Sequence, residues 1–72
     1  MSLKNEINDD FHNFAIAYEN TNHFDFFIKV YGKENIPQIV KIMEKNGYEK
    51  AEQKSWSYEY HIYGLGFNKK EE

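Results

Sequence analysis

The side chains that could do chemistry in this chain are three histidines, four serine and threonine hydroxyls and scattered carboxylates, and cysteine is absent. A zinc site needs three or four ligands that converge in space. The best candidate set is His23 and Asp25, two residues apart, with the distant His61. This spacing is not specific to metal sites, so we expect these histidines and His12 to be solvent-facing or hydrogen-bonded. The sequence therefore predicts no metal site.

The hydroxyl side chains do not lie in the patterns that activate a nucleophile. None lies in a strand–turn–helix elbow such as G-x-S-x-G. Gly64-Leu65-Gly66 lies in or beside a strand and opens no helix, the wrong context for a dinucleotide-binding loop. The neighbouring carboxylates Asp9 and Asp10 fall on the polar side of a candidate helix, where solvated charge is their simplest role. We therefore predict that the protein is not an enzyme and uses no cofactor.

Size and charge narrow the class of protein further. The chain has 72 residues, enough for one small domain over 1–72, and its net charge is −3. All nine cationic residues are lysine. Because the arginine fork is the usual tool for phosphate and base recognition, a nucleic-acid partner is disfavoured. No apolar run is long enough to cross a membrane and the first residues lack a signal-peptide core, so we expect no membrane partner and a cytoplasmic location.

Aromatic residues make up 18% of the chain, as six Phe, six Tyr and one Trp. A domain of this size buries only about 60% of its unfolded surface. The aromatic side chains can therefore be used in three ways: they pack under the chain's own loops, form a homodimer interface, or form a surface for a partner. Lys, Asn, Ile, Phe and Tyr supply half of the residues. Their AT-rich codons indicate a low-GC source such as a bacterium, a phage or a mobile element.

The clearest strand pattern covers 24–31. Phe24, Phe26, Ile28 and Val30 alternate with Asp25, Phe27, Lys29 and Tyr31, which predicts one wholly apolar face and one mixed face. Gly32 ends this strand. Phe27 and Tyr31 then stand where a simple two-layer domain would carry polar residues.

The segment before this strand allows two interpretations. Apolar residues from Leu3 to Tyr18 recur every three or four positions, which favours a helix over 2–19 with Ser2 as its cap. The alternative is a strand over 13–19, with Phe14, Ile16 and Tyr18 on one face and Ala15 and Ala17 on the other, in a hairpin with 24–31. In either case 20–23 is a loop.

A second helix is predicted over 35–46. Asn35 is a favourable N-cap, Pro37 fits the first turn, and Gly47 follows the last turn. Its apolar face consists of Ile36, Ile39, Val40 and Met43, with Ile42 at the flank.

The C-terminal third reads as extended. The polar segment 48–54 fits an edge strand, and 55–57 fits a turn or bulge. Trp56, Tyr58, Tyr60 and Ile62 then alternate with polar residues, and the apolar phase changes beside Gly64, which predicts a β-bulge there. We expect 68–72 to be a frayed, charged tail.

These elements predict a small α+β two-layer sandwich, with one or two helices packed on one face of a three- or four-stranded sheet. The helix after 24–31 could lead to a parallel neighbouring strand or to an antiparallel return. The other sheet face would carry Phe27 and Tyr31, together with either Trp56, Tyr58 and Tyr60 or His61 and Tyr63 from the C-terminal strand. The residues expected to bind a partner are Phe27, Tyr31, Trp56, Tyr58 and Tyr60.

The function expected from this surface is non-enzymatic protein–protein interaction. The protein would be a small inhibitor or regulator from a phage or mobile element that docks on a larger protein. The alternative is that the exposed rings form a homodimer, through the same face or through an edge strand.

One segment also resembles a known family. A helix, then Asn46-Gly47-Tyr48, a polar strand and a strand containing a histidine are similar to the small HicA-type toxin ribonucleases. That resemblance, over less than half of the chain, implies a double-stranded-RNA-binding-like fold with His61 as the acid/base group. The chain departs from the family in its acidic charge. Ser57-Tyr58-Glu59-Tyr60 also precedes His61 where the family has a glycine-containing segment.

Overall fold

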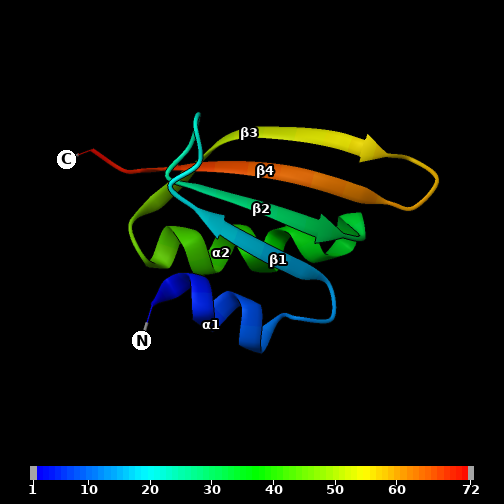
Figure 1. Cartoon of the computed structure of the whole chain (residues 1–72), viewed down its shortest axis with the longest axis horizontal. Coiled ribbons are helices and arrows are strands. Elements are labelled where there is room, and N and C mark those ends of the chain that lie inside the picture. Colours follow the sequence, from blue (N-terminus) through cyan, green and yellow to red (C-terminus); the bar gives the residue numbers. More distant parts are fainter. Residues whose placement is uncertain (1, 72) are drawn as a thin grey trace.

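A computed structural model describes residues 2–71 as two helices, one short 3-10 turn and a four-stranded sheet (Figure 1). The elements in chain order are α1 (Leu3–Asp10), β1 (Ala15–Glu19), β2 (Phe26–Tyr31), η1 (Lys33–Asn35), α2 (Ile36–Lys45), β3 (Tyr48–Ser57) and β4 (Ile62–Lys69). The predicted α+β two-layer sandwich is confirmed.

The sheet is antiparallel at every pairing, in the order β1-β2-β4-β3. After α2 the chain enters the edge strand β3 and returns through β4, which pairs with β2. Of the two connections that the sequence allowed, the antiparallel return is therefore the one that forms beside β2. The strand that organises the sequence, β2, lies in the interior of the sheet.

Both interpretations of the N-terminal segment are partly right. The helix ends at Asp10, and residues 15–19 form β1 in a hairpin with β2. Ser2 caps α1 as expected, because its Oγ accepts a hydrogen bond of 3.1 Å from the Asn5 N–H. Between the two elements the chain makes one tight turn, in which the N–H groups of Phe14 and Ala15 both donate to the Phe11 carbonyl.

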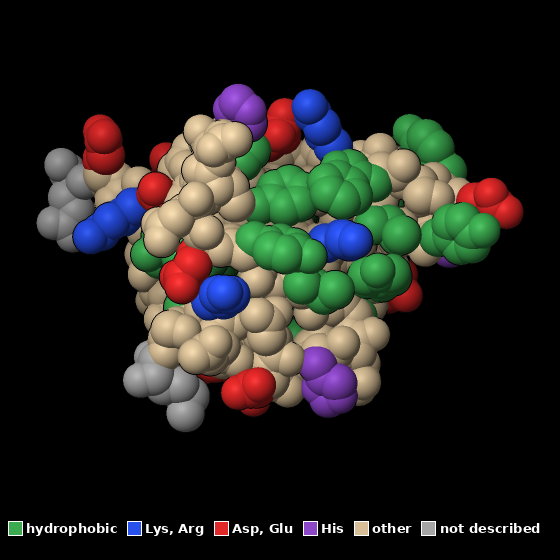
Figure 2. All heavy atoms as spheres, viewed as in Figure 1, with side chains coloured by type: hydrophobic (Ala, Val, Ile, Leu, Met, Phe, Trp, Pro, Cys, Tyr) green, Lys and Arg blue, Asp and Glu red, His purple; other side chains and the backbone are tan. Residues whose placement is uncertain are grey.

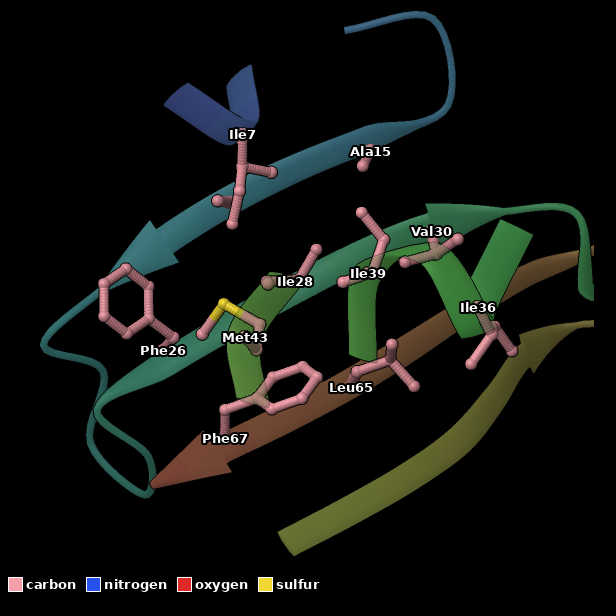
Figure 3. Packing of buried hydrophobic residues seen from close by; sticks show 11 residues of the cluster. Ile7, Ala15, Phe26, Ile28, Val30, Ile36, Ile39, Met43, Leu65 and Phe67 are labelled. Atoms are coloured by element: carbon pink, nitrogen blue, oxygen red, sulfur yellow. The ribbon is translucent and has the colours of Figure 1, made fainter. Parts of the chain in front are cut away.

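The core lies between the sheet and the two helices. Figure 3 shows side chains from α1, α2 and the strands pointing toward one another. The buried set is Ile7, Ala15, Ala17, Phe26, Ile28, Val30, Ile36, Ile39, Met43, Leu65 and Phe67. The predicted apolar faces of β2 and α2 are both in it, with Val40 and Ile42 packed at its margin.

Phe24 was predicted for this core, and that prediction is wrong. The residue precedes β2, and its ring lies over Gly66, whose missing side chain would meet the Phe24 ring at 2.6 Å. Gly66 pairs with Phe27, so Phe24 covers the opposite face of the sheet. The chain turns away from the strand direction in the polar loop before β2. The alternation between buried and opposite-face side chains therefore begins only at Phe26.

The C-terminal third also differs from the prediction. Residues 58–61 form the turn between β3 and β4, so Tyr58 and Tyr60 do not lie on a strand. The shift in the apolar alternation, which predicted a β-bulge beside Gly64, is caused by this turn. The register shifts lie in β3 instead, at Lys50/Glu52 and Ser55/Ser57, which confirms irregularity at 55–57.

The expected frayed tail is shorter than predicted. Asn68 and Lys69 belong to β4. The Lys69 N–H donates to the Asp25 carboxylate at 2.7 Å, and the Asp25 N–H donates to Asn68 Oδ1 at 3.1 Å. The Lys70 N–H donates to the Gly47 carbonyl at 2.8 Å. These bonds hold the end of β4, and residue 72 lies outside the described residues.

One sheet edge is covered by a helix side chain. Asn8 of α1 accepts a hydrogen bond of 2.8 Å from the Ala17 N–H and donates one of 3.3 Å to the Ala17 carbonyl. Both backbone groups belong to the edge strand β1, so the amide occupies positions that another strand would use. Asn8 therefore holds α1 against β1 and also blocks the pairing of another strand at this edge.

Replacing Asn8 with alanine is expected to lower the free energy of unfolding by about 1–2 kcal/mol, because two part-buried backbone groups lose their partner. Urea unfolding followed by circular dichroism measures the change. Asn5→Ala is the matched control, since the Asn5 side chain is exposed on the same helix. Equal effects of the two substitutions would show that the Asn8 bonds contribute nothing specific.

Candidate functional site

The residues that could have formed a metal or catalytic centre do not gather. Among residues 2–71 no group of three or more His, Asp or Glu side chains is placed to hold a metal ion. The predicted strand position of His61 is wrong, because His61 ends the β3–β4 turn with a φ of 56°. Asp25 is held by the backbone of β4. The chemistry-bearing groups are therefore dispersed over the fold.

The side chains that do gather lie on the sheet face turned away from the core. This open face is formed by Ile16, Tyr18, Phe24, Phe27, Lys29, Tyr31, Trp56 and Ile62, with Glu52 and Lys54 of β3 at its edge. Figure 2 views this side of the molecule and shows hydrophobic side chains grouped over the sheet around a lysine. Trp56 is 53% exposed and Tyr18 is 45% exposed. The open face is thus aromatic and accessible to solvent.

Two glycines of β4 create the space in which the rings lie. A Cβ on Gly64 would stand 2.6 Å from Phe27 Cζ and 2.8 Å from Trp56 Nε1. A Cβ on Gly66 would stand 2.6 Å from the Phe24 ring. Because β4 carries no side chain at these positions, rings from β2, β3 and the loop before β2 approach its backbone closely.

Phe27 and Trp56 form the centre of this arrangement. Their rings stack at a centroid distance of 5.2 Å with an interplanar angle of 25°. Lys29 Nζ lies 5.5 Å from the centre of the Trp56 ring, within range of a cation–π interaction. The stack fixes the indole orientation and leaves the outer surface of the indole to solvent.

A shallow hollow lies beside the stack. Its volume is about 370 Å³, and its apolar lining includes Phe24, Phe27 and Trp56. Glu52 and Lys54 line it from β3 and form an ion pair of 3.3 Å. The hollow is large enough for one side chain of another molecule and is bounded by both apolar and charged groups.

The structure divides the five residues that the sequence predicted for binding. Phe27, Tyr31 and Trp56 lie together on the open face. Tyr58 and Tyr60 lie in the β3–β4 turn, which extends beyond the rest of the sheet (Figure 1). They are 82% and 68% exposed. The predicted set therefore covers the face and its projecting end, and not one compact patch.

Sequence reasoning missed Phe24, Ile16 and Tyr18 as members of the open face. Ala15 and Ala17 alternate with Ile16 and Tyr18, and small residues are the ones that fit beneath the nearby α1. The strand interpretation of 13–19 contained this signal. For Phe24 the only signal was Gly66, and it required knowing which strands pair.

Replacing Gly64 with alanine is expected to shift the Trp56 emission to longer wavelength while the fold persists. The new methyl group displaces the Phe27 and Trp56 rings. An extended strand favours Ala over Gly by about 0.5–1 kcal/mol, which offsets the lost stacking. Trp56 is the only tryptophan, so its fluorescence reports this site alone.

Gly66→Ala is the control for this prediction, because it displaces Phe24 and leaves the Phe27–Trp56 stack in place. Its emission spectrum is expected to match that of the unmodified protein. A shift in both variants, or in neither, would contradict the arrangement described for Gly64.

Two further findings bear on the class of protein. Within the described residues, no helix is long and apolar enough to cross a membrane. Comparisons of the chain with protein-family models, with curated proteins and with solved structures found no match.

Proposed function

We propose that this protein is a non-enzymatic docking module that binds a larger protein through its open face. The observation that carries the proposal is the aromatic sheet face that no element of residues 2–71 covers. The composition supports a cytoplasmic inhibitor or regulator from a low-GC bacterium, phage or mobile element.

The exposed area supports a binding role. An aromatic side chain buries about 150–250 Å², so the exposed parts of Tyr18, Tyr31 and Trp56 amount to about 300 Å². The largest apolar patch on a typical monomer is about 300–600 Å² and often functional. The exposed area of these three side chains already reaches this range, and Ile16 and Phe27 add to it.

The hairpin end supplies further contact area. A stable interface buries about 800 Å² per partner. Four strands spaced about 4.8 Å apart and about six residues long give a face of roughly 400 Å², which is about half of that area. Tyr58 and Tyr60 project beyond this face, and we include them at the rim of the docking surface.

Photo-crosslinking in cells tests the proposal. Benzoylphenylalanine at position 18 reports contacts of the open face, and at position 38 it reports contacts of the exposed side of α2. Expression in a low-GC bacterium is expected to give an adduct with a larger protein from position 18 only. Adducts of the same mass and yield from both positions, or none from position 18, would refute docking through this face.

A further inference from the structure

We infer that the partner presents a carboxylate to Lys29 beside an apolar side chain that enters the neighbouring hollow. This inference rests on the proposed docking function, and it specifies the partner's chemistry. It also selects a different protein over a second copy of this chain.

Lys29 lies at the middle of the open face. Across the sheet it pairs with Ile16 of β1 on one side and with Gly64 of β4 on the other. Along β2, Phe27 and Tyr31 project from the same face, two residues before and two residues after Lys29. Trp56 covers the Gly64 side. The ammonium group is therefore surrounded by apolar and aromatic side chains.

This ammonium group has no carboxylate partner within the described part of the chain. The one ion pair found among residues 2–71 joins Lys54 to Glu52. The Trp56 ring is the group that faces Lys29 Nζ, at 5.5 Å. Solvent stabilises the charge while the face is open. A partner that covers the face removes this water, and an unpaired buried charge is costly.

A carboxylate on the partner removes that cost. It forms a charge-assisted hydrogen bond with the ammonium group in surroundings where such bonds are strong. The hollow borders Trp56 as well, and it takes an apolar side chain against Phe24 and Phe27. The partner is thus expected to carry an Asp or Glu with a large apolar residue close to it.

A homodimer through this face fails on the same geometry. In a two-fold dimer that buries the whole face, the centre of one face meets the centre of the other. Each Lys29 would then approach its own copy, with two like charges in a water-excluded interface. No carboxylate of the open face is free to separate them, since Glu52 is paired with Lys54. A different protein is therefore favoured over a second copy.

A phosphate group could also pair with Lys29, but the rest of the chain argues against a nucleic acid. The net charge is −3 and no arginine is present. Stacking of bases on a sheet requires a basic surround as well as aromatic rings. We therefore argue for a protein carboxylate and make nucleic-acid binding one outcome of the test.

The test is a selection of peptides from a randomised display library on the immobilised full-length protein. Peptides retained by the wild type are expected to be enriched in Asp or Glu next to a large apolar residue. Synthetic copies of them should bind Lys29→Met about 10- to 100-fold more weakly, because methionine keeps the apolar stem and lacks the charge. Lys41→Met, on the exposed side of α2 and away from the open face, is the matched control and should change the dissociation constant less than about threefold.

The charge reversal Lys29→Glu should retain peptides with Lys or Arg in place of the acid. An unchanged circular dichroism spectrum and urea midpoint of each variant show that the sheet has kept its structure. Light scattering of the wild type should give the monomer mass. A dimer that Lys29→Met strengthens would overturn the choice of partner.

The outcomes separate this inference from the proposal beneath it. If selected peptides need Trp56 but bind Lys29→Met as tightly as the wild type, docking stands and the carboxylate inference falls. If no peptide is retained, or if binding does not depend on Trp56, the docking proposal itself falls. Tight binding of a mixed-sequence single-stranded oligonucleotide, lost on Lys29→Met, would overturn the choice of a protein carboxylate.

Discussion

Replacing Phe67 with alanine is expected to lower the free energy of unfolding by about 3–5 kcal/mol. Phe67 is fully buried in the core beside Met43 and Leu65 (Figure 3), so its removal leaves a cavity that the sheet cannot close. A domain of this length has about 4–11 kcal/mol of stability in total. The variant should therefore be partly unfolded at room temperature, with a urea midpoint lowered by about 2 M or more.

Phe24→Ala is the control for this prediction, and it tests a structural correction at the same time. Phe24 is partly exposed and lies over Gly66 on the open face. Its removal should cost clearly less, about 1–2 kcal/mol, because the ring is partly in water and its loss leaves a gap at the surface and not a closed cavity. If Phe24→Ala is as destabilising as Phe67→Ala, Phe24 belongs to the core, as its alternation in the sequence predicted.

The elements that the sequence predicted best have strong local signals at both ends. The α2 helix combines an apolar stripe with Pro37 in its first turn and Gly47 after its last, where φ is 89°. The β2 strand combines strict alternation with a terminating glycine. In both cases the local pattern and the tertiary packing require the same structure, so the pattern was sufficient.

Two errors arose where a turn imitated the period of a regular element. Phe11 and Phe14 continue the helical stripe past Asp10, yet they belong to a turn in which their rings pack edge to face at 5.6 Å. Tyr58 and Tyr60 continue the alternation of β3 through a turn. The left-handed position of that turn is occupied by His61, so the turn contains no glycine that would mark it in the sequence. A pattern of residue types cannot separate these cases.

The site was predictable only in part, for a related reason. Phe27 and Tyr31 followed from alternation within one strand, whereas alternation left open whether Trp56 or the opposite face of the C-terminal strand points outward. Their arrangement depends on β4 lying between β2 and β3, since Gly64 and Gly66 then form the surface on which the rings lie. Strand order is a tertiary property, so neither the stack nor the central position of Lys29 could be derived from the sequence.

Replacing Trp56 with alanine is expected to weaken binding of the selected peptides about 30-fold or more. Central aromatic residues of an interface commonly contribute about 2 kcal/mol or more, and Trp is the type most enriched among them. Trp56 contacts Phe27, Lys29 and the hollow, so its loss removes three features of the face together. Isothermal titration with synthetic peptides measures the change.

The fold should survive this substitution, because the indole is 53% exposed and lies outside the core. Circular dichroism is expected to show a native spectrum with a loss of about 2 kcal/mol or less in unfolding free energy. Tyr58→Ala is the comparison, since Tyr58 is more exposed than Trp56 but lies at the rim. Rim residues contribute little, so this variant should bind within about fivefold of the wild type. If exposure alone decided affinity, Tyr58→Ala would be the more damaging change, and the position of Trp56 at the centre of the face would carry no weight.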